Sequence, residues 1–480
     1  MNTWQWEMFE DIVNPVHGLL SVTPGPLCAP IEELSIRRNE DRELVLSTTA
    51  QKGAERSAID YPAGTVRRNE DTLEFTTSTG FTGVARGVTI QNWGRTLDAT
   101  GEWGPTREDG WLHSLTLTSQ RGGEGLYTIE WLENFPADSF TWPSGISDKI
   151  LSTESRVVGR GSDAITLEKI NKLKAGGGDN HCVSLKVSNI ELYLSSATLG
   201  LEKKQLIKPG FIIYKGAPDQ DIRNKIRNCI SFALGSFLVY LGCTVLDGEL
   251  EPVSITAVNA DRLLDRVSKV GVLPPAPLER RYEREVDQQA LSRIVNGMYA
   301  KYDDLHLEQL VWAYWHAVCA PAHIAAAHFG AAIEALQDAY MNACGSEYQT
   351  KLITDKEKWR ELQTHLIEAI RAAALDSDAE FILLNKISGL NSVPRSKLSE
   401  QIFERLRIRL GEHEERAWRQ RHLAAHGDVM DEDPIAIIRE TKLLRLIFHR
   451  ILLKVTSGSD TYRDYYSLKF PIRRLEEPVS

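Results

Sequence analysis

The sequence has few cysteines and no CxxC pair. Its six cysteines, the first at Cys28 and the last at Cys344, are spread over 480 residues. A chain of this length buries a core without disulfide staples, so we expect reduced thiols and a reducing, cytoplasmic compartment. The segment Met1–Pro15 also lacks the basic start and the apolar run of a signal peptide, so no export is expected.

Long apolar runs are missing as well. The best candidate, the uncharged segment Ile230–Leu246, is shorter than the roughly 20 residues that a membrane-spanning helix needs. It also contains small and polar residues such as Ser231, Gly235 and Gly242. We therefore expect a buried segment here and no membrane partner.

A strong excess of one charge is also absent. The chain has 66 acidic and 56 basic residues, with 42% hydrophobic and 25% charged residues. These values are typical of folded proteins and exclude wholesale disorder, collagen-like repeats and coiled-coil rods. At a net charge of −10, nucleic acid can be contacted only through a local patch. Residues 401–480 hold a small excess of basic residues, which favours this part for RNA.

The first two hundred or so residues have the pattern of β structure. Short runs of β-branched and aromatic residues alternate with Gly, Pro and Asp turn residues. The expected strands are Leu44–Ser47, Thr72–Thr77, Thr82–Ile90, Ser114–Ser119, Tyr127–Leu132, Cys182–Val187, Glu191–Leu194 and Phe211–Tyr214. Their spacing predicts a sandwich-like domain, closed by a helix over Asp219–Leu246.

Tryptophan is concentrated in this β-rich part. Seven of the 11 tryptophans precede residue 143, and they are Trp4, Trp6, Trp93, Trp103, Trp111, Trp131 and Trp142. The simpler interpretation is that they fill the core, and the alternative is an aromatic binding surface.

A proline-rich connector, Val272–Leu278, precedes a sharp change in composition. We place the domain boundary near residue 280, between a β-rich part (1–280) and an all-α part (281–480). The expected helices are Val286–Tyr302, Leu305–Cys319, Ala322–Ala343, Asp355–Ala374, Glu380–Ile387, Lys397–His426 and Pro434–Lys454, the last capped by Asp433. The predicted fold class is therefore α+β in two domains, with a helical bundle at the C-terminal end.

The segment Arg416–Asp428 carries the most reactive set of side chains. Arg421, His422 and His426 precede Gly427, a residue that commonly ends helices. The two histidines share a helix face, and the arginine is rotated off that face. An imidazole can move the proton of a ribose 2′-OH, and a guanidinium can bind the phosphate as charge develops. This combination suits RNA cleavage without a metal or cofactor. The alternative is that the basic residues only stabilise the helix, by interacting with the negative C-terminal end of its dipole.

Other candidate sites have weaker patterns. His316, Cys319 and His323 have a spacing that could place metal ligands on one helix face, but Pro321 interrupts that helix and no fourth ligand is evident. We expect no metal site here. The run Ala175–Gly178 lacks the Gly-Lys-Ser/Thr ending of a P-loop, so we interpret it as a linker and expect no nucleotide cofactor.

The motif Arg421–His426 matches the R-x4-H signature of HEPN domains, with a polar residue in second place. The whole layout resembles ApeA-type anti-phage HEPN proteins, in which a β-rich N-terminal domain precedes a helical HEPN domain. The segment Gly125–Asn134 is similar to the strand by which that N-terminal domain is recognised. A second match, from Arg360 to His365, has the acidic Glu361 in second place and lies mid-helix, so we expect no site there.

The resemblance implies a metal-independent HEPN endoribonuclease in anti-phage defence by abortive infection. Arg421 and His426 would form the catalytic pair, His422 would be their polar companion, and Glu334 would be an acidic residue supplied by an earlier helix. Cellular RNA, with tRNA as an attractive target, would be left with 2′,3′-cyclic phosphate ends. Family members typically form homodimers with facing motifs, and the β-rich part would sense a phage-derived or infection-induced trigger. The alternative is a catalytically inactive HEPN scaffold that dimerises and binds RNA.

Overall fold

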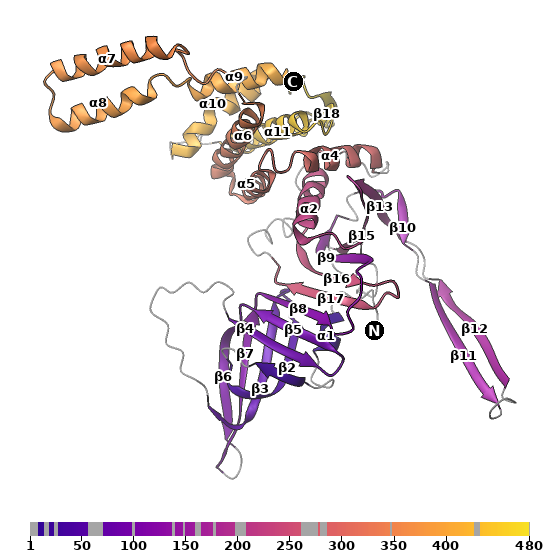
Figure 1. Ribbon diagram of the computed structural model, residues 1–480. Helices are drawn as coiled ribbons and strands as arrows, with labels where there is room; N and C mark the ends of the chain where they lie inside the picture. Colours follow the sequence, from indigo (N-terminus) through magenta and orange to yellow (C-terminus); the bar gives the residue numbers. More distant parts are fainter. Residues whose placement is uncertain are drawn as a thin grey trace. The chain divides into compact units, whose positions relative to one another are not determined.

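The computed structural model forms two compact units, Met1–Val295 and Asn296–Ser480 (Figure 1). The sequence placed this boundary near residue 280. The residues that the structure describes are 8–13, 19–23, 27–55, 71–97, 101–136, 140–146, 149–158, 165–175, 179–196, 208–260, 277–278, 286–345, 348–426 and 433–479. A β-rich N-terminal part is followed by a helical part, which confirms the predicted α+β organisation in two parts.

The first unit contains an eleven-stranded and a four-stranded sheet, and every pairing within them is antiparallel. The larger sheet has the spatial order β1 (Leu19–Thr23), β4 (Thr72–Thr77), β5 (Phe81–Arg86), β8 (Ser114–Ser119), β17 (Pro252–Val258), β16 (Tyr240–Leu246), β9 (Tyr127–Phe135), β15 (Lys208–Lys215), β14 (Ile190–Ser196), β13 (Asp179–Val187) and β10 (Ser144–Ile146). The smaller sheet has the order β2 (Ala29–Arg38), β3 (Leu44–Glu55), β7 (Trp103–Leu112) and β6 (Thr89–Leu97). This unit also contains the hairpin of β11 (Lys149–Val158) and β12 (Ile165–Ala175) and the helices α1 (Met8–Ile12) and α2 (Gln220–Leu234).

One apolar core joins the two sheets. Buried side chains from β2, β3 and β7 pack against buried side chains from β4, β5, β8 and β17. Leu46 and Leu112 come from the smaller sheet, and Phe75, Leu117 and Ile255 come from the larger one. Alternation of buried and exposed positions along these strands places one set of side chains in this core.

Two predicted elements of this unit are wrong. The helix expected over Asp219–Leu246 ends at Leu234, because Gly235 adopts a left-handed conformation with a φ of 59°. From Tyr240 onwards the apolar run forms the strand β16, which pairs with β9 and β17. Likewise, the single strand expected over Thr82–Ile90 is divided at Gly87, with a φ of 67°, where the chain leaves β5 and enters β6 of the other sheet. In both cases a glycine with a positive φ ends an element that its neighbours would continue.

The tryptophans of the β-rich part divide between the core and the surface. Trp131 and Trp142 are buried, as the simpler interpretation expects, whereas Trp93, Trp103 and Trp111 on β6 and β7 are exposed. Trp4 and Trp6 lie outside the described residues.

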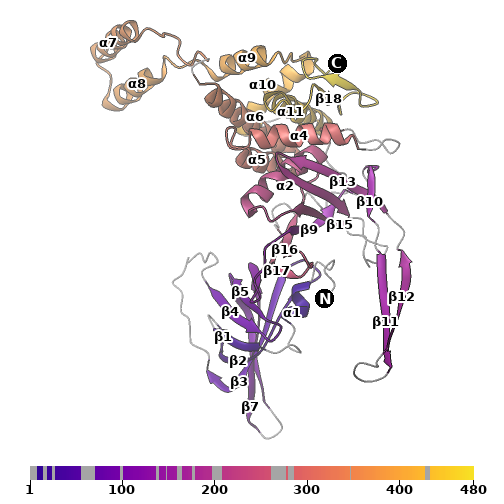
Figure 2. The same ribbon diagram turned by 45° about the vertical axis from the view of Figure 1, so that its right-hand side comes forward.

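The second unit is built on helices, with one small hairpin near the end of the chain. The elements in chain order are α4 (Gln288–Ala300), which begins in the first unit, α5 (Leu307–Cys319), α6 (Ala322–Cys344), α7 (Lys356–Ala372), α8 (Ser377–Gly389), α9 (Arg395–Leu406), α10 (Glu412–His426), α11 (Pro434–Val455), β18 (Thr461–Arg463) and β19 (Ile472–Arg474). Helices α6, α10 and α11 pack against one another, and α7 and α8 form a hairpin that extends away from them (Figure 2). The predicted cap of α11 is confirmed, since Asp433 accepts a hydrogen bond of 2.9 Å from the Ile435 amide.

The single helix expected over Lys397–His426 is wrong. Helix α9 ends at Leu406, and Arg407 follows with a φ of 56°. Ile408 is buried, and the Arg409 amide donates to the Glu476 carbonyl, so the chain crosses to the C-terminal segment before α10 begins. This long-range contact overrides local helix propensity.

Two further expectations concern the whole chain. No disulfide joins the six cysteines, all of which lie in described segments. Throughout the described ranges, every helix is too short or too polar to cross a bilayer.

Candidate active site at the end of helix α10

The predicted motif lies at the C-terminal end of α10. Arg421 begins the last stretch of this helix, whose final residue is His426. The backbone of His422 and His426 is helical, whereas their side chains lie outside the described part, as does Gly427. The geometry of the site is therefore built from Arg421 and the residues around it.

Arg421 and Glu334 form a short ion pair between α10 and α6. Arg421 donates from Nη2 to Glu334 Oε1 at 2.7 Å and from Nε to the same oxygen at 3.3 Å. The arginine side chain is 6% exposed and the glutamate side chain is 30% exposed. The structure thus brings together the two residues that the sequence placed 87 positions apart.

The close approach of the two helices depends on a glycine. Gly330 lies one turn before Glu334 on α6, and a Cβ atom there would be 2.9 Å from Arg421 Cδ. On the other side, the Arg421 guanidinium lies over the Trp418 ring, with Cζ 3.3 Å from the ring centroid, and Nη1 donates to the Trp418 carbonyl. Arg421 is therefore fixed by a carboxylate, a carbonyl and an aromatic face.

A second arginine completes the charge balance. Arg395, at the start of α9, donates from Nη2 to the Glu334 carbonyl at 2.6 Å and forms an ion pair with Asp338. Its Nε atom is 3.9 Å from Glu334 Oε2. Gly330, Glu334 and Asp338 are spaced four apart and share one face of α6. Two carboxylates thus face two guanidinium groups.

Burial lowers the pKa of Arg421 from its usual value, Glu334 opposes this shift, and Arg395 adds to it. An arginine stays charged in proteins despite such a shift. Of its five N–H groups, Glu334 and Trp418 take three. Two N–H groups of this cation therefore have no hydrogen-bond partner within the described ranges.

The other sequence candidates are not assembled into sites. His316 Nδ1 lies 2.8 Å from the Trp312 carbonyl, and the two rings stack at 3.7 Å between centroids. Cys319 ends α5, and His323 lies on the next helix. Within the described part of the chain, no group of three or more His, Cys, Asp or Glu residues could hold a metal ion.

The second R-x4-H match lies on α7. There, His365 is 68% exposed, with Nδ1 at 3.8 Å from Glu368. Its arginine, Arg360, faces a different group of residues. In this second match, therefore, the arginine and the histidine lie in different surroundings.

Sequence reasoning missed Arg395, Asp338 and Trp418. Asp338 could have been found from its i+4 spacing to Glu334, and Trp418 from its i−3 spacing to Arg421. Arg395 carried no local signal, because it reaches α6 only through the fold.

The first unit holds a buried polar network that the sequence also did not reveal. Glu130 on β9 is fully buried and accepts from Arg223 Nε at 3.1 Å and from Arg227 Nη1 at 2.9 Å. Tyr214 donates to the same carboxylate at 3.1 Å, and burial raises the pKa of this tyrosine well above its usual value. These partners satisfy the buried carboxylate, so the network stabilises the packing of α2 on the sheet.

Comparison of the chain with protein-family models, curated proteins and solved structures finds no match.

Proposed function

We propose that this protein is a metal-independent HEPN-type endoribonuclease whose active site is the C-terminal end of α10. The observation that carries the proposal is the Arg421–Glu334 pair at 2.7 Å, which holds a guanidinium in the R-x4-H motif directly before two histidines. An acidic residue from an earlier helix is what the HEPN resemblance implies.

In this proposal His426 moves the proton of the ribose 2′-OH, which attacks the adjacent phosphate. Arg421 stabilises the charge that develops on the phosphate, and His422 orients the phosphate or its partner. Glu334 acts as a positioning residue, since its carboxylate fixes the direction of the guanidinium. The products are a 2′,3′-cyclic phosphate and a 5′-hydroxyl.

The biological part of the proposal is anti-phage defence by abortive infection. The β-rich first unit would sense a phage-derived or infection-induced trigger and restrain the nuclease, and two copies would place their motifs face to face. Cleavage of cellular RNA, such as tRNA, would then stop growth of the infected cell.

A second candidate function is a non-catalytic RNA-binding scaffold. It is favoured by the same ion pair, because a guanidinium that is 6% exposed and already paired has a sufficient structural role. Under this alternative the histidines only complement the dipole at the helix end.

The test compares wild type with His426→Ala in a bacterial host under phage challenge and maps RNA ends that carry cyclic phosphates. We expect such ends only with wild type, and at least about a hundredfold slower cleavage by the purified variant, the usual size of a lost general acid or base. His365→Ala is the matched control, because it removes the exposed histidine of the second R-x4-H match. Equal RNA ends in all three proteins would favour the scaffold.

A further inference from the structure

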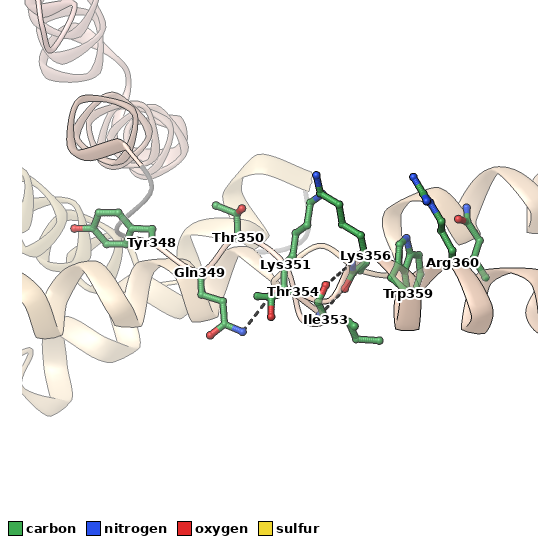
Figure 3. A pocket seen from close by; sticks show the side chains of 11 residues that line it. Tyr348, Gln349, Thr350, Lys351, Ile353, Thr354, Lys356, Trp359 and Arg360 are labelled. Carbon is green, nitrogen blue, oxygen red and sulfur yellow. Dashed lines mark hydrogen bonds between the residues drawn. The ribbon is translucent and has the colours of Figure 1, made fainter.

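The α7–α8 hairpin carries a hollow at its base. Its volume is about 370 Å³, within the range of roughly 300–1,000 Å³ typical of small-ligand sites. Ten of the eleven lining residues lie between Tyr348 and Gln363, where the chain enters α7 (Figure 3), and the eleventh, Asn391, follows α8. This position is on a different part of the second unit from the Arg421 motif.

Three cations surround the hollow. Lys351, Lys356 and Arg360 line it, and none of the eleven lining residues is acidic. Their long side chains project to the same side of the segment in Figure 3. None of the three forms an ion pair with a residue that the structure describes. The hollow is therefore a local positive site on a chain with a net charge of −10.

An aromatic ring lies among these charges. Trp359 is half-buried and shares a stripe of α7 with Lys356, Arg360 and Gln363, at helical spacings of three and four. Cations that can bind phosphates, beside an indole on which a base can stack, are the combination used by sites for single-stranded nucleic acid. An acidic peptide would use the cations and leave the indole without a role.

The base of the hairpin is held by the backbone. Asn391 accepts from the Ile353 amide at 2.6 Å and donates to the Ile353 carbonyl at 3.0 Å. The Leu352 amide donates to the Asn391 carbonyl, and the Val393 amide donates to the Thr350 carbonyl. These bonds fix the segment that carries Lys351 against the residues that follow α8, so this side of the site is preorganised.

The helix dipole does not account for this site. Asp355 caps α7 with its own carboxylate, which accepts from the amides of Glu357 and Lys358. Two first-turn amides are therefore already occupied by a carboxylate, and the attraction for an anion comes from the three side chains.

We infer that this hollow binds a single-stranded segment of RNA, with Lys351, Lys356 and Arg360 on its phosphates and Trp359 against a base. The choice of RNA rests on the proposed nuclease function. The hollow then supplies substrate affinity away from the cleavage site, and the second R-x4-H match contributes its arginine to binding and not to chemistry.

The experiment measures binding of a fluorescein-labelled oligouridine by fluorescence anisotropy, using the full chain with His426→Ala so that the probe is not cut. The variant Lys351→Gln, Lys356→Gln, Arg360→Gln is compared with a charge-matched control, Lys358→Gln, Arg371→Gln, Lys386→Gln, on the same hairpin. Single-strand binding loses about 0.7 in salt slope for each phosphate contact, so we expect the slope to fall by about 2 in the first variant alone.

The aromatic contact is tested separately. Trp359→Ala should weaken binding about tenfold, and Trp359→Phe should restore most of the affinity, since stacking on an aromatic face tolerates a change of ring. Circular dichroism verifies that the variants keep their helix content. Equal losses in both triple variants, or binding of polyglutamate with the same residue dependence and no binding of oligouridine, would overturn the inference.

The result is separable from the proposed function. If cleavage persists in His426→Ala while oligouridine binding depends on the hollow, the nuclease assignment is wrong and the RNA site stands. If cleavage requires His426 and binding ignores the three cations, the nuclease stands and the hollow is not its RNA site.

Discussion

The two ends of helix α10 each carry an ion pair, and the two pairs differ in how completely they are closed. At the N-terminal end, Glu414 and Arg450 are both 0% exposed, with Nη1 and Oε1 2.6 Å apart. At the C-terminal end, Arg421 is 6% exposed and Glu334 is 30% exposed. The same helix thus has one sealed pair and one that solvent reaches through its carboxylate.

Both members of the sealed pair also form hydrogen bonds with backbone groups of the protein. Arg450 also donates to the carbonyls of Leu475 and Arg409, and Glu414 Oε2 accepts from the amides of Gly411 and Val479. Burial raises the pKa of Glu414, and Arg450 and the two amides act in the opposite direction. Both oxygens of Glu414 are thus hydrogen-bonded and neither side chain of the pair is exposed, so we assign this pair to structure.

The open pair is incomplete by comparison. Among the described residues, Glu334 Oε2 has only the distant Arg395 Nε at 3.9 Å, whereas Arg421 donates three hydrogen bonds, as Arg450 does. The two pairs therefore differ in the exposure of their carboxylates, and not in the number of hydrogen bonds that their arginines donate.

The largest expected effect is at the sealed pair. Arg450→Met leaves Glu414 buried without its cation and should lower the free energy of unfolding by about 3–5 kcal/mol, measured by urea denaturation. The double variant Glu414→Leu, Arg450→Met is the control and should recover part of this loss. A change of less than about 1 kcal/mol in the single variant would show that the pair is not closed.

A buried histidine gives the next largest effect, through pH. Burial and the charge of Arg445 lower the pKa of His449 to about 3, and Tyr314 Oη lies 2.9 Å from its Nε2. The unfolded chain binds a proton near pH 6.5 that the folded chain excludes. Stability should therefore fall as pH drops from about 6.5 towards 3, by up to about 1.4 kcal/mol per pH unit, and stay constant above this window.

Denaturation over this pH range measures that slope. His449→Gln is the matched control, because its amide can still bond to Tyr314 but does not titrate. An unchanged slope in the variant would assign the pH dependence to other groups.

Mutation of the open pair should lower the free energy of unfolding by less than mutation of the sealed pair. Glu334→Gln keeps an acceptor for Arg421 but removes its charge, so we expect a loss of about 1–2 kcal/mol in unfolding free energy. The rate of RNA cleavage should fall even under conditions where the variant stays folded, since the guanidinium loses its fixed direction. A stability loss as large as that of Arg450→Met would remove the distinction between the two ends of α10.

The smallest effect is expected at the exposed ion pair of Arg395 and Asp338. Arg395 is 31% exposed and pairs with Asp338, which is 51% exposed, so Arg395→Gln should lower stability by less than about 1 kcal/mol. Added salt should lower the unfolding free energy of the wild type towards that of the variant, because salt screens exposed ion pairs. A large, salt-independent loss would place Arg395 with the sealed pair.

Much of the helical part was predictable. Asp433 and Pro434 mark the start of α11 by local chemistry alone, and the expected helix over Ala322–Ala343 differs from α6 by one residue at its end. Several strands, such as Thr72–Thr77 and Ser114–Ser119, were predicted with their observed bounds. Local propensity and capping decide such elements, so the sequence suffices for them.

The order of a β-rich and a helical part and the Arg421–His426 motif followed from the amino-acid sequence, and the HEPN resemblance added Glu334 as a candidate residue. The tertiary structure was needed to show that Tyr240–Leu246 is a strand and not a helix, and that the helix expected over Lys397–His426 breaks at Arg407. It was also needed to show that Arg421 pairs with Glu334 and Arg450 with Glu414. Each of these depends on contacts between segments distant in sequence, whose free energy exceeds local preference and leaves no periodic signal in the chain.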